Sequence, residues 1–222
     1  MLFIYCSGTI SSEILDIALR CNYKEYQIRF VDDAPKVKND VFKNRILNFT
    51  ELSEMITSKD KVIIANGEPL IRSKIYEKCK IKNMNFETLI DPAAIRSPSS
   101  EVGEGSIIYE FCSLSSNSNI SENVLVNRQS IIGHDISIGE HSVISSTVNL
   151  GGSVKIGKLV YIGMGALIRE GISIMDKSII SMGSVVHKDI PEGVIVVGNP
   201  ARVSKRNEDM KIFKKPSFNK NV

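Results

Sequence analysis

The chain has few of the residues that mark metal centres and disulfide-stapled folds. It holds three histidines and four cysteines in 222 residues. The cysteines, Cys6, Cys21, Cys79 and Cys112, have neither the spacing of a zinc site nor that of a disulfide framework. We therefore expect no bound metal, and reduced, mostly buried thiols of the kind that persist in a cytoplasm.

The chain also lacks a long apolar run and a strong excess of one charge. Without a stretch of about eighteen apolar residues, no membrane-spanning segment is expected. Residues 1–5 are too short for a secretory core and carry no basic leader, which again favours the cytoplasm. Since 28 basic residues are balanced by 25 acidic ones, for a formal net charge of +3, a broad nucleic-acid-binding surface is not expected.

The most regular feature of the chain is an aliphatic residue at every sixth position from Val102 to Val186. A helix has a period of about 3.6 and a half-buried strand a period of about 2, so neither explains the pattern. Period six is typical of the hexapeptide β-helix, a prism of short parallel strands. An Ile-rich β-sandwich, the alternative, would show irregular spacing and turns roughly every 8–12 residues. The repeating residues are Val102, Ile108, Leu114, Ile120, Val126, Ile132, Ile138, Ile144, Leu150, Ile156, Ile162, Ile168, Ile174, Ile180 and Val186.

Residues eighteen positions apart should stack in this prism, because three six-residue faces complete one coil. Stacked strands lie about 4.8 Å apart, so Ile138 is expected between Ile120 and Ile156. The position two residues before each aliphatic is small or compact, which predicts a second inward-facing side chain on each face. These residues are Ser106, Cys112, Ser118, Ser130, Ser142, Val148, Val154, Ala166 and Ser178.

The first ninety residues have a different pattern, in which short apolar segments alternate with segments of helical periodicity. This alternation predicts a small Rossmann-like α/β domain with a parallel sheet. The expected strands are 2–6, 27–31 and 61–65; the expected helices are 11–20, 50–57 with Thr50 as N-cap, and 69–79 with Pro69 in the first turn.

The two patterns divide the chain into an α/β domain at 1–90, a β-helix at 91–200 and a Lys-rich tail at 201–222. The Pro/Ser-rich stretch 91–100 is interpreted as the linker between the domains. The tail is polar enough to be partly disordered.

Gly8 follows the first expected strand and precedes the first helix, where ligands meet a helix N-terminus in α/β folds. A tight turn explains a single glycine equally well. Asp32 comes 24 residues later, near the spacing at which a carboxylate meets a ribose hydroxyl. Because the three-glycine fingerprint is missing, NAD is not expected, whereas a smaller nucleotide at the C-terminal ends of the strands remains open.

His134 is the strongest candidate for a catalytic residue. It comes two residues after Ile132, which places it at a corner outside the prism. Eighteen residues on either side lie Ser116 and Gly152, so small residues should leave a groove around the ring. Asp135 is adjacent and could fix the tautomer of a general base. The alternative is a solvent-facing histidine beside a solvated carboxylate.

The other two histidines carry weaker signals. His141 also falls on a corner and is interpreted as a surface polar residue. His187 is about three coils from His134, too far for a shared site in one chain. A zinc site built by His134 and His141 across two chains is an unfavoured alternative.

The segments 131–139 (IIGHDISIG) and 151–157 (GGSVKIG) resemble those of hexapeptide-repeat acyltransferases. More specifically, the chain resembles the sialic acid O-acetyltransferase family, which includes bacterial UDP-4-amino-sugar N-acetyltransferases. Three segments are similar to that family's sugar-nucleotide-binding domain: 30–33 (FVDD), 64–67 (IANG) and 71–72 (IR). Segment 89–95 (LIDPAAI) is similar to the family's entry into the β-helix, and segment 198–202 (GNPAR) to its ending.

The resemblance implies a left-handed parallel β-helix, a homotrimer, and acetyl-CoA bound between neighbouring β-helices. It implies acetyl transfer to the amino group of a nucleotide-linked 4-amino sugar, with UDP as the nucleotide, for bacterial surface glycan or glycoprotein biosynthesis. His134 would be the general base and Asp135 its acidic partner. The residues implied for the sugar nucleotide are Gly8, Asp32, Asp33, Asn66 and Gly67. The residues expected for acetyl-CoA are Gly152, Gly165, Gly183 and Arg202. Among the basic residues, Arg202, Lys205 and Arg206 could meet the CoA phosphates, with a solvated basic tail as the alternative.

The chain departs from the family pattern at Thr9, Gly133 and Val143, where histidine, asparagine and a second histidine are common. Two other functions remain. A sugar O-acetyltransferase would use the same fold, base and cofactor on a hydroxyl. A non-catalytic hexapeptide scaffold would need no base in a groove, and His134 between small stacked residues argues against it.

Overall fold

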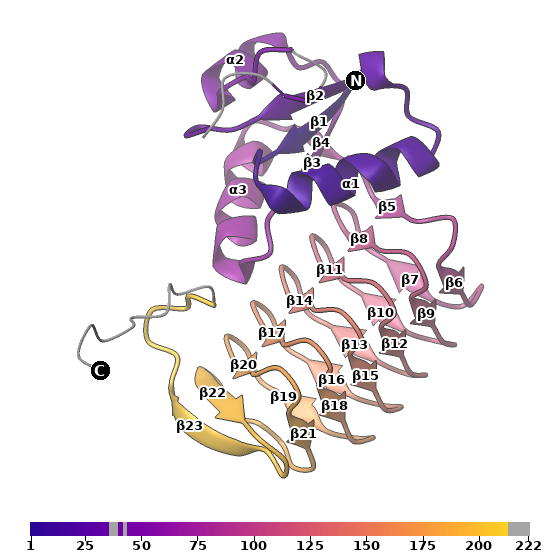
Figure 1. Cartoon of the computed structure of the whole chain (residues 1–222), viewed down its shortest axis with the longest axis vertical. Helices are drawn as coiled ribbons and strands as arrows, with labels where there is room; N and C mark the ends of the chain where they lie inside the picture. The colour runs from indigo at the N-terminus through magenta and orange to yellow at the C-terminus, as the bar shows by residue number, and fades with distance from the viewer. Residues whose placement is uncertain (36–39, 42–43, 213–222) are drawn as a thin grey trace, which may run out of the picture.

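The computed structural model describes residues 1–35, 40–41 and 44–212. It consists of an N-terminal α/β domain seated on one end of a triangular β-helix, as Figure 1 shows. The C-terminal hairpin lies at the opposite end of the β-helix. No helix within the described ranges is both long and apolar enough to cross a membrane.

The N-terminal domain contains a parallel four-stranded sheet in the order β2-β1-β3-β4. Apolar side chains from both faces of β1 enter the core. Leu2 and Ile4 belong to one buried cluster with α1, and Phe3 and Tyr5 to a second one with α2 and α3. The strands are β1 (Leu2–Tyr5), β2 (Ile28–Val31), β3 (Lys61–Ile64) and β4 (Asn85–Phe86); the helices are α1 (Thr9–Arg20), α2 (Phe49–Met55) and α3 (Pro69–Ile81), with a 3₁₀ turn, η1 (Glu25–Gln27).

The start of α2 differs from the sequence prediction. The N-cap is Asn48, not Thr50: the Asn48 side chain accepts from the Glu51 amide at 3.0 Å, and the Glu51 carboxylate accepts from the Asn48 amide at 2.9 Å. This reciprocal capping box satisfies two amide donors at once. A cap at Thr50 would forgo it, so the helix begins at Phe49.

The β-helix has three faces of stacked two-residue strands. The eight-stranded face contains β5 (Leu89–Ile90), β8 (Ile107–Ile108), β11 (Leu125–Val126), β14 (Val143–Ile144), β17 (Tyr161–Ile162), β20 (Ile179–Ile180), β22 (Val194–Val197) and β23 (Arg202–Arg206). The six-stranded face contains β6 (Ile95–Arg96), β9 (Ser113–Leu114), β12 (Ile131–Ile132), β15 (Asn149–Leu150), β18 (Leu167–Ile168) and β21 (Val185–Val186). The five-stranded face contains β7 (Glu101–Val102), β10 (Asn119–Ile120), β13 (Ser137–Ile138), β16 (Lys155–Ile156) and β19 (Ser173–Ile174).

The predicted register is confirmed. Ile138 pairs in parallel with Ile120 and Ile156, each eighteen residues away. The sixth-position aliphatics are buried, except that Val102 in the first coil is half-buried. The predicted small inward residues are buried as well. Among them, the Ser142 hydroxyl donates to the Gly157 carbonyl and accepts from the Val160 amide, so its polar group is satisfied inside the core.

The segment interpreted as a linker is instead part of the β-helix. β5 pairs with β8 and β6 pairs with β9. The amides of Asp91 and Ser97 donate to the carbonyls of the next coil. These backbone bonds hold the Pro/Ser-rich stretch in the stack although its side chains are polar.

The first part of the predicted tail is also ordered. β23 pairs antiparallel with β22 and closes the end of the eight-stranded face. Residues 213–222, the rest of that tail, lie outside the described residues.

Candidate active site

The three edges of the prism carry different residues. The His134 edge, between the six- and five-stranded faces, stacks Ser116, His134 and Gly152. The methionine edge, between the eight- and six-stranded faces, stacks Met164 and Gly165 over Met182 and Gly183. The docking edge, between the five- and eight-stranded faces, stacks Asn123 and His141 and meets α3.

His134 and Asp135 form a hydrogen-bonded pair. Asp135 Oδ2 lies 2.7 Å from His134 Nδ1, and Asn117 Nδ2 donates to Asp135 Oδ1 at 3.0 Å. Since the carboxylate can only accept, Nδ1 carries the proton and Nε2 of the neutral ring is left as an acceptor. The His134 side chain is 65% exposed, so Nε2 is open to a ligand.

The electrostatics of the pair keep Asp135 ionised. The hydrogen bond from His134 and then that from Asn117 hold the pKa of the Asp135 carboxyl below its usual range. A negative charge beside Nδ1 stabilises an imidazolium once the ring has taken a proton.

Gly152 lies against the His134 ring. A Cβ added to Gly152 would lie 2.4 Å from His134 Nε2, which no real side chain tolerates. Among the described residues, the Gly152 amide donates to no backbone or side-chain acceptor. The glycine therefore places a free N–H group close to the open nitrogen of the ring.

The predicted nucleotide residues lie at the C-terminal ends of β1, β2 and β3, and four of the five line one cavity. The cavity has a volume of about 560 Å³ and is lined by Gly8, Asp32, Asn66 and Gly67 together with Cys6, Thr9, Ile10, Ala65 and Glu68. Gly8 caps α1 with an extended backbone, and nothing lies within 4 Å of an added Cβ. The glycine thus leaves open space at a helix N-terminus, where anions are favoured.

Asp32 and Asp33 have different environments. Asp32 accepts from the Ser7 amide and hydroxyl at 2.8 and 2.7 Å, which holds the carboxylate at the cavity. Asp33 turns away, toward Tyr5 at 2.8 Å and Lys78 at 2.7 Å. The structure therefore does not bring Asp33 to the other predicted nucleotide residues.

Two of the residues implied for acetyl-CoA lie on the methionine edge rather than beside His134. Gly165 and Gly183 have φ of +68° and +66°, in the left-handed region that favours glycine. An added Cβ at Gly165 would meet only Thr147 at 3.9 Å, and one at Gly183 would meet nothing within 4 Å. Within one chain these glycines and His134 belong to different edges.

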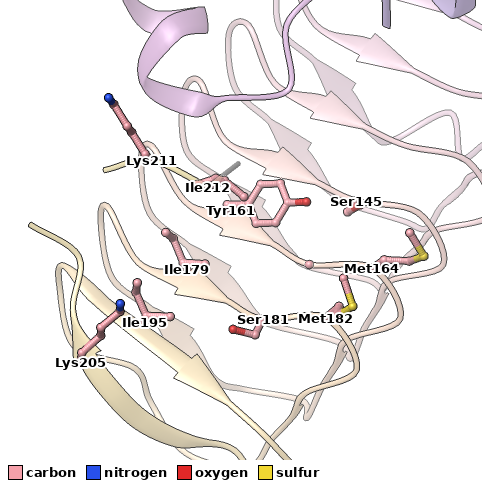
Figure 2. A pocket seen from close by; sticks show the side chains of 11 residues that line it. Ser145, Tyr161, Met164, Ile179, Ser181, Met182, Ile195, Lys205, Lys211 and Ile212 are labelled. Atoms are coloured by element: carbon pink, nitrogen blue, oxygen red, sulfur yellow. The ribbon is translucent and has the colours of Figure 1, made fainter. Parts of the chain in front are cut away.

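A groove of about 600 Å³ lies on the eight-stranded face next to the methionine edge. Figure 2 shows Tyr161, Ile179 and Ile195 along its floor. Met164 and Met182 lie at one end, and Lys205 and Lys211 lie at the other. The groove combines an apolar floor with a basic end, which suits a ligand that has an apolar arm and anionic groups.

Arg202 is on β23 and exposed, and its guanidinium donates to the Ala201 carbonyl. It does not line this groove, whereas Lys205 of the same strand does. The pairing of β22 with β23 has a register shift, and Arg202, opposite Val197, lies further along the hairpin than Lys205, opposite the groove residue Ile195.

The interpretation of His141 as a surface residue is wrong. His141 is half-buried on the docking edge, with its ring 5.3 Å from that of Tyr76 and its Nδ1 2.9 Å from Asn123 Nδ2. His187 is exposed beside the six-stranded face. Within the described residues, no group of three potential ligands could hold a metal ion.

Known proteins resemble both the first part of this chain and most of its length. Residues 1–79 match the PglD N-terminal domain family. The chain is similar over 91% of its length to the acetyltransferase domain of PglB from Neisseria gonorrhoeae in complex with acetyl coenzyme A, with 27% identity, a TM-score of 0.85 and 98% of that chain covered. It is similar to WeeI from Acinetobacter baumannii, with 25% identity, a TM-score of 0.85 and coverage of 91% and 99%.

The chain therefore resembles nucleotide amino-sugar acetyltransferases, both in its N-terminal domain and over 91% of its length. PerB from Caulobacter crescentus, in complex with CoA and GDP-perosamine, shares the fold at 23% identity and a TM-score of 0.83, over 91% of this chain and 96% of that one. These likenesses confirm the left-handed β-helix and the small parallel-sheet domain expected from the sequence. The family resemblance stated from the motifs is likewise confirmed.

The sequence reasoning missed several residues of the groove. Tyr161 gave no signal, because it falls at an outward position where the repeat tolerates any residue, and Met164 and Met182 fall at corner positions that are equally tolerant. The one available sign was the eighteen-residue column of Met164 and Met182. Lys211 could not be placed, because its position depends on the return of the chain past β23 toward Glu68, whose carboxylate accepts from the Ile212 amide.

Proposed function

We propose that the protein is an acetyl-CoA-dependent N-acetyltransferase that acts on the amino group of a nucleotide-linked amino sugar, for bacterial surface glycan or glycoprotein biosynthesis. The observation that carries the proposal is the His134–Asp135 pair, with Nε2 open to solvent beside the free Gly152 amide. The PerB complex holds both CoA and GDP-perosamine, which supports the same pair of substrates here. The free thiols of all four cysteines fit the cytoplasmic location expected for such a reaction.

The proposed chemistry follows from this geometry. The neutral acceptor amine attacks the thioester carbonyl carbon and forms the new C–N bond, while His134 Nε2 takes the amine proton. The Gly152 N–H group donates to the oxyanion of the tetrahedral intermediate. The C–S bond then breaks, and the imidazolium returns its proton to the sulfur, which leaves as the CoA thiol. Asp135 stabilises the imidazolium throughout.

Acetyl-CoA is proposed to lie in the groove beside the methionine edge. The apolar floor of Tyr161, Ile179 and Ile195 suits the pantetheine arm, and Lys205 and Lys211 suit the phosphates. Gly165 and Gly183, at the corner of that groove, would allow close approach of the arm.

This placement requires a second chain, because the methionine edge and the His134 edge are different edges of one prism. We therefore keep the homotrimer as part of the proposal. Ile131 and Leu167, 49% and 44% exposed on the six-stranded face between these edges, offer an apolar contact surface. His134→Ala lacks the proposed base, and Met182→Trp places a large side chain in the proposed acetyl-CoA groove, so each variant should be inactive alone. Mixed oligomers should regain activity, because one chain can supply the base and its neighbour the groove.

The acceptor nucleotide is proposed to bind in the cavity at Gly8, Asp32, Asn66 and Gly67. Its volume of about 560 Å³ is within the usual range for small-molecule sites. This cavity favours a nucleotide-linked acceptor over a free sugar such as sialic acid, since a free sugar needs no separate nucleotide domain.

The test is an acetylation assay with UDP-, dTDP-, GDP- and CMP-linked 4-amino sugars. CoA thiol release and acetylated product are measured together, with the corresponding 4-hydroxy sugars as the matched control. Acetyl transfer to one of the amines supports the proposal. Transfer only to hydroxyls, or to none of the acceptors, contradicts it.

A further inference from the structure

Arg72 is fully buried in α3, between the N-terminal domain and the β-helix. All its hydrogen bonds go to uncharged oxygens. Nη1 donates to the carbonyls of Ile64 and Asn66 at 2.7 and 3.1 Å. Nε and Nη2 donate to the Asn123 carbonyl at 3.1 and 3.0 Å, and Nη2 also donates to Asn123 Oδ1 at 2.7 Å.

The two sets of acceptors belong to different parts of the molecule. Ile64 ends β3, and Asn66 lines the proposed nucleotide cavity. Asn123 is a corner residue of the docking edge, is itself fully buried and has a φ of +53°. The guanidinium therefore joins the cavity wall to the first coils of the β-helix through a single side chain.

Only arginine can make this set of contacts. Its planar fork carries five N–H donors, and five contacts are made here; lysine has three donors on one nitrogen. Burial lowers the pKa of Arg72 to about 10, which leaves it charged at neutral pH. A buried charge that is solvated only by fixed carbonyls holds those carbonyls in place, because moving any of them leaves a donor unpaired.

We propose that Arg72 is a positioning residue for the nucleotide sugar: it fixes the Asn66–Gly67 wall of the cavity in one place relative to the β-helix edges. This inference rests on the proposed function for its kinetic part. Arg72 does not line the cavity, so it acts through the Asn66 backbone. The Asn66 side chain in turn accepts from the Glu68 amide at 2.9 Å, and Glu68 also lines the cavity.

Arg128 offers a matched control. It also joins the two domains, with Glu13 of α1 at 3.3 Å and Glu110 of the β-helix at 2.9 Å. It lines neither the nucleotide cavity nor the groove beside the methionine edge. A residue that merely ties the domains together should behave like Arg128 when it is replaced by lysine.

The experiment compares Arg72→Lys, Asn123→Ala and Arg128→Lys in the full chain. Amide hydrogen exchange over residues 65–68 is measured with no ligand. Arg72→Lys and Asn123→Ala should speed that exchange by about tenfold or more, the cost of one lost charge-assisted hydrogen bond. Arg128→Lys should leave it unchanged.

The kinetic part uses the amino sugar that the wild type acetylates. The KM for that sugar should rise by about tenfold in Arg72→Lys, while the KM for acetyl-CoA and kcat stay within about twofold. Unchanged exchange at 65–68, or equal rises in both KM values, would overturn the inference. If the wild type acetylates none of the sugars, the proposed function fails, and the exchange comparison still decides the role of Arg72.

Discussion

Asp135 Oδ2 lies 2.7 Å from Nδ1 of His134, its neighbour in sequence. Adjacent side chains usually point apart. Here Asp135 adopts φ +56° at the corner, and Asn117 of the coil before holds its second oxygen. The corner of a hexapeptide repeat thus provides an oriented histidine and carboxylate from two consecutive residues.

Replacing Asp135 by asparagine should lower kcat by about 10²-fold or more, because an amide can present its N–H group to Nδ1 and favour the wrong tautomer. Asparagine tolerates a positive φ, so the fold should be retained. The kcat is measured at saturating substrates, with the melting temperature as the control. A normal kcat would show that the carboxylate is dispensable.

Gly152→Ala should displace the His134 ring, because the new Cβ would lie 2.4 Å from Nε2. We expect kcat to fall by about 10²-fold. The clash should disappear in the double variant with His134→Ala, so that alanine at 152 lowers the melting temperature only when the histidine is present. An equal loss of stability in both backgrounds would mean that the strain has another source.

Ile138→Asp should destabilise the protein by several kcal/mol, because it buries an unpaired charge between Ile120 and Ile156. Ser137→Asp is the matched control, since Ser137 is exposed on the same strand. Urea denaturation measures both. Equal midpoints for the two variants would contradict the register.

His141 should make the stability depend on pH. Arg72 can only donate, so Asn123 Oδ1 must face it and Asn123 Nδ2 must donate to an unprotonated His141 Nδ1. Burial and then the Arg72 charge lower the pKa of His141, against the opposing charges of Glu77, Glu140 and Glu122. The folded state therefore binds its proton less readily than the unfolded state.

The direction of this pH dependence follows from the linkage between proton binding and folding. This stability contribution is fully present above the unfolded pKa of about 6.5 and is lost as pH falls through the lower folded pKa. Unfolding free energies from pH 8 to 5 should fall less steeply in His141→Gln than in the wild type. If the unfolding free energies of both proteins fall equally steeply with pH, protonation of His141 does not contribute to the pH dependence of stability.

Much of the β-helix could be predicted because its core is local in sequence. Each coil repeats the same contacts after eighteen residues, so the period alone gave the partners of Ile138. The convergence of Gly8, Asp32 and Asn66 was predictable for a similar reason: parallel strands end at one edge of a sheet.

The remaining features of the site could not be predicted, because they depend on how the two domains pack and on which side chains come into contact there. Asp33 turns to Tyr5 and Lys78 because α3 packs nearby, which no local pattern reveals. His141 is half-buried because Tyr76 of α3 covers its corner. The assignment of His134 and Gly165 to different edges follows from counting corners, but the groove beside Gly165 depends on the returning segment near Lys211.

The central claim is that His134 is the base for acetyl transfer. The most direct measurement is single-turnover acetyl transfer by His134→Ala, with His187→Ala as the control, since His187 is exposed and about three coils away. The rate of His134→Ala should fall by about 10²–10⁴-fold with acetyl-CoA binding retained, and His187→Ala should match the wild type. A His134→Ala rate equal to that of His187→Ala would contradict the claim and mean that the acceptor amine needs no base from this chain.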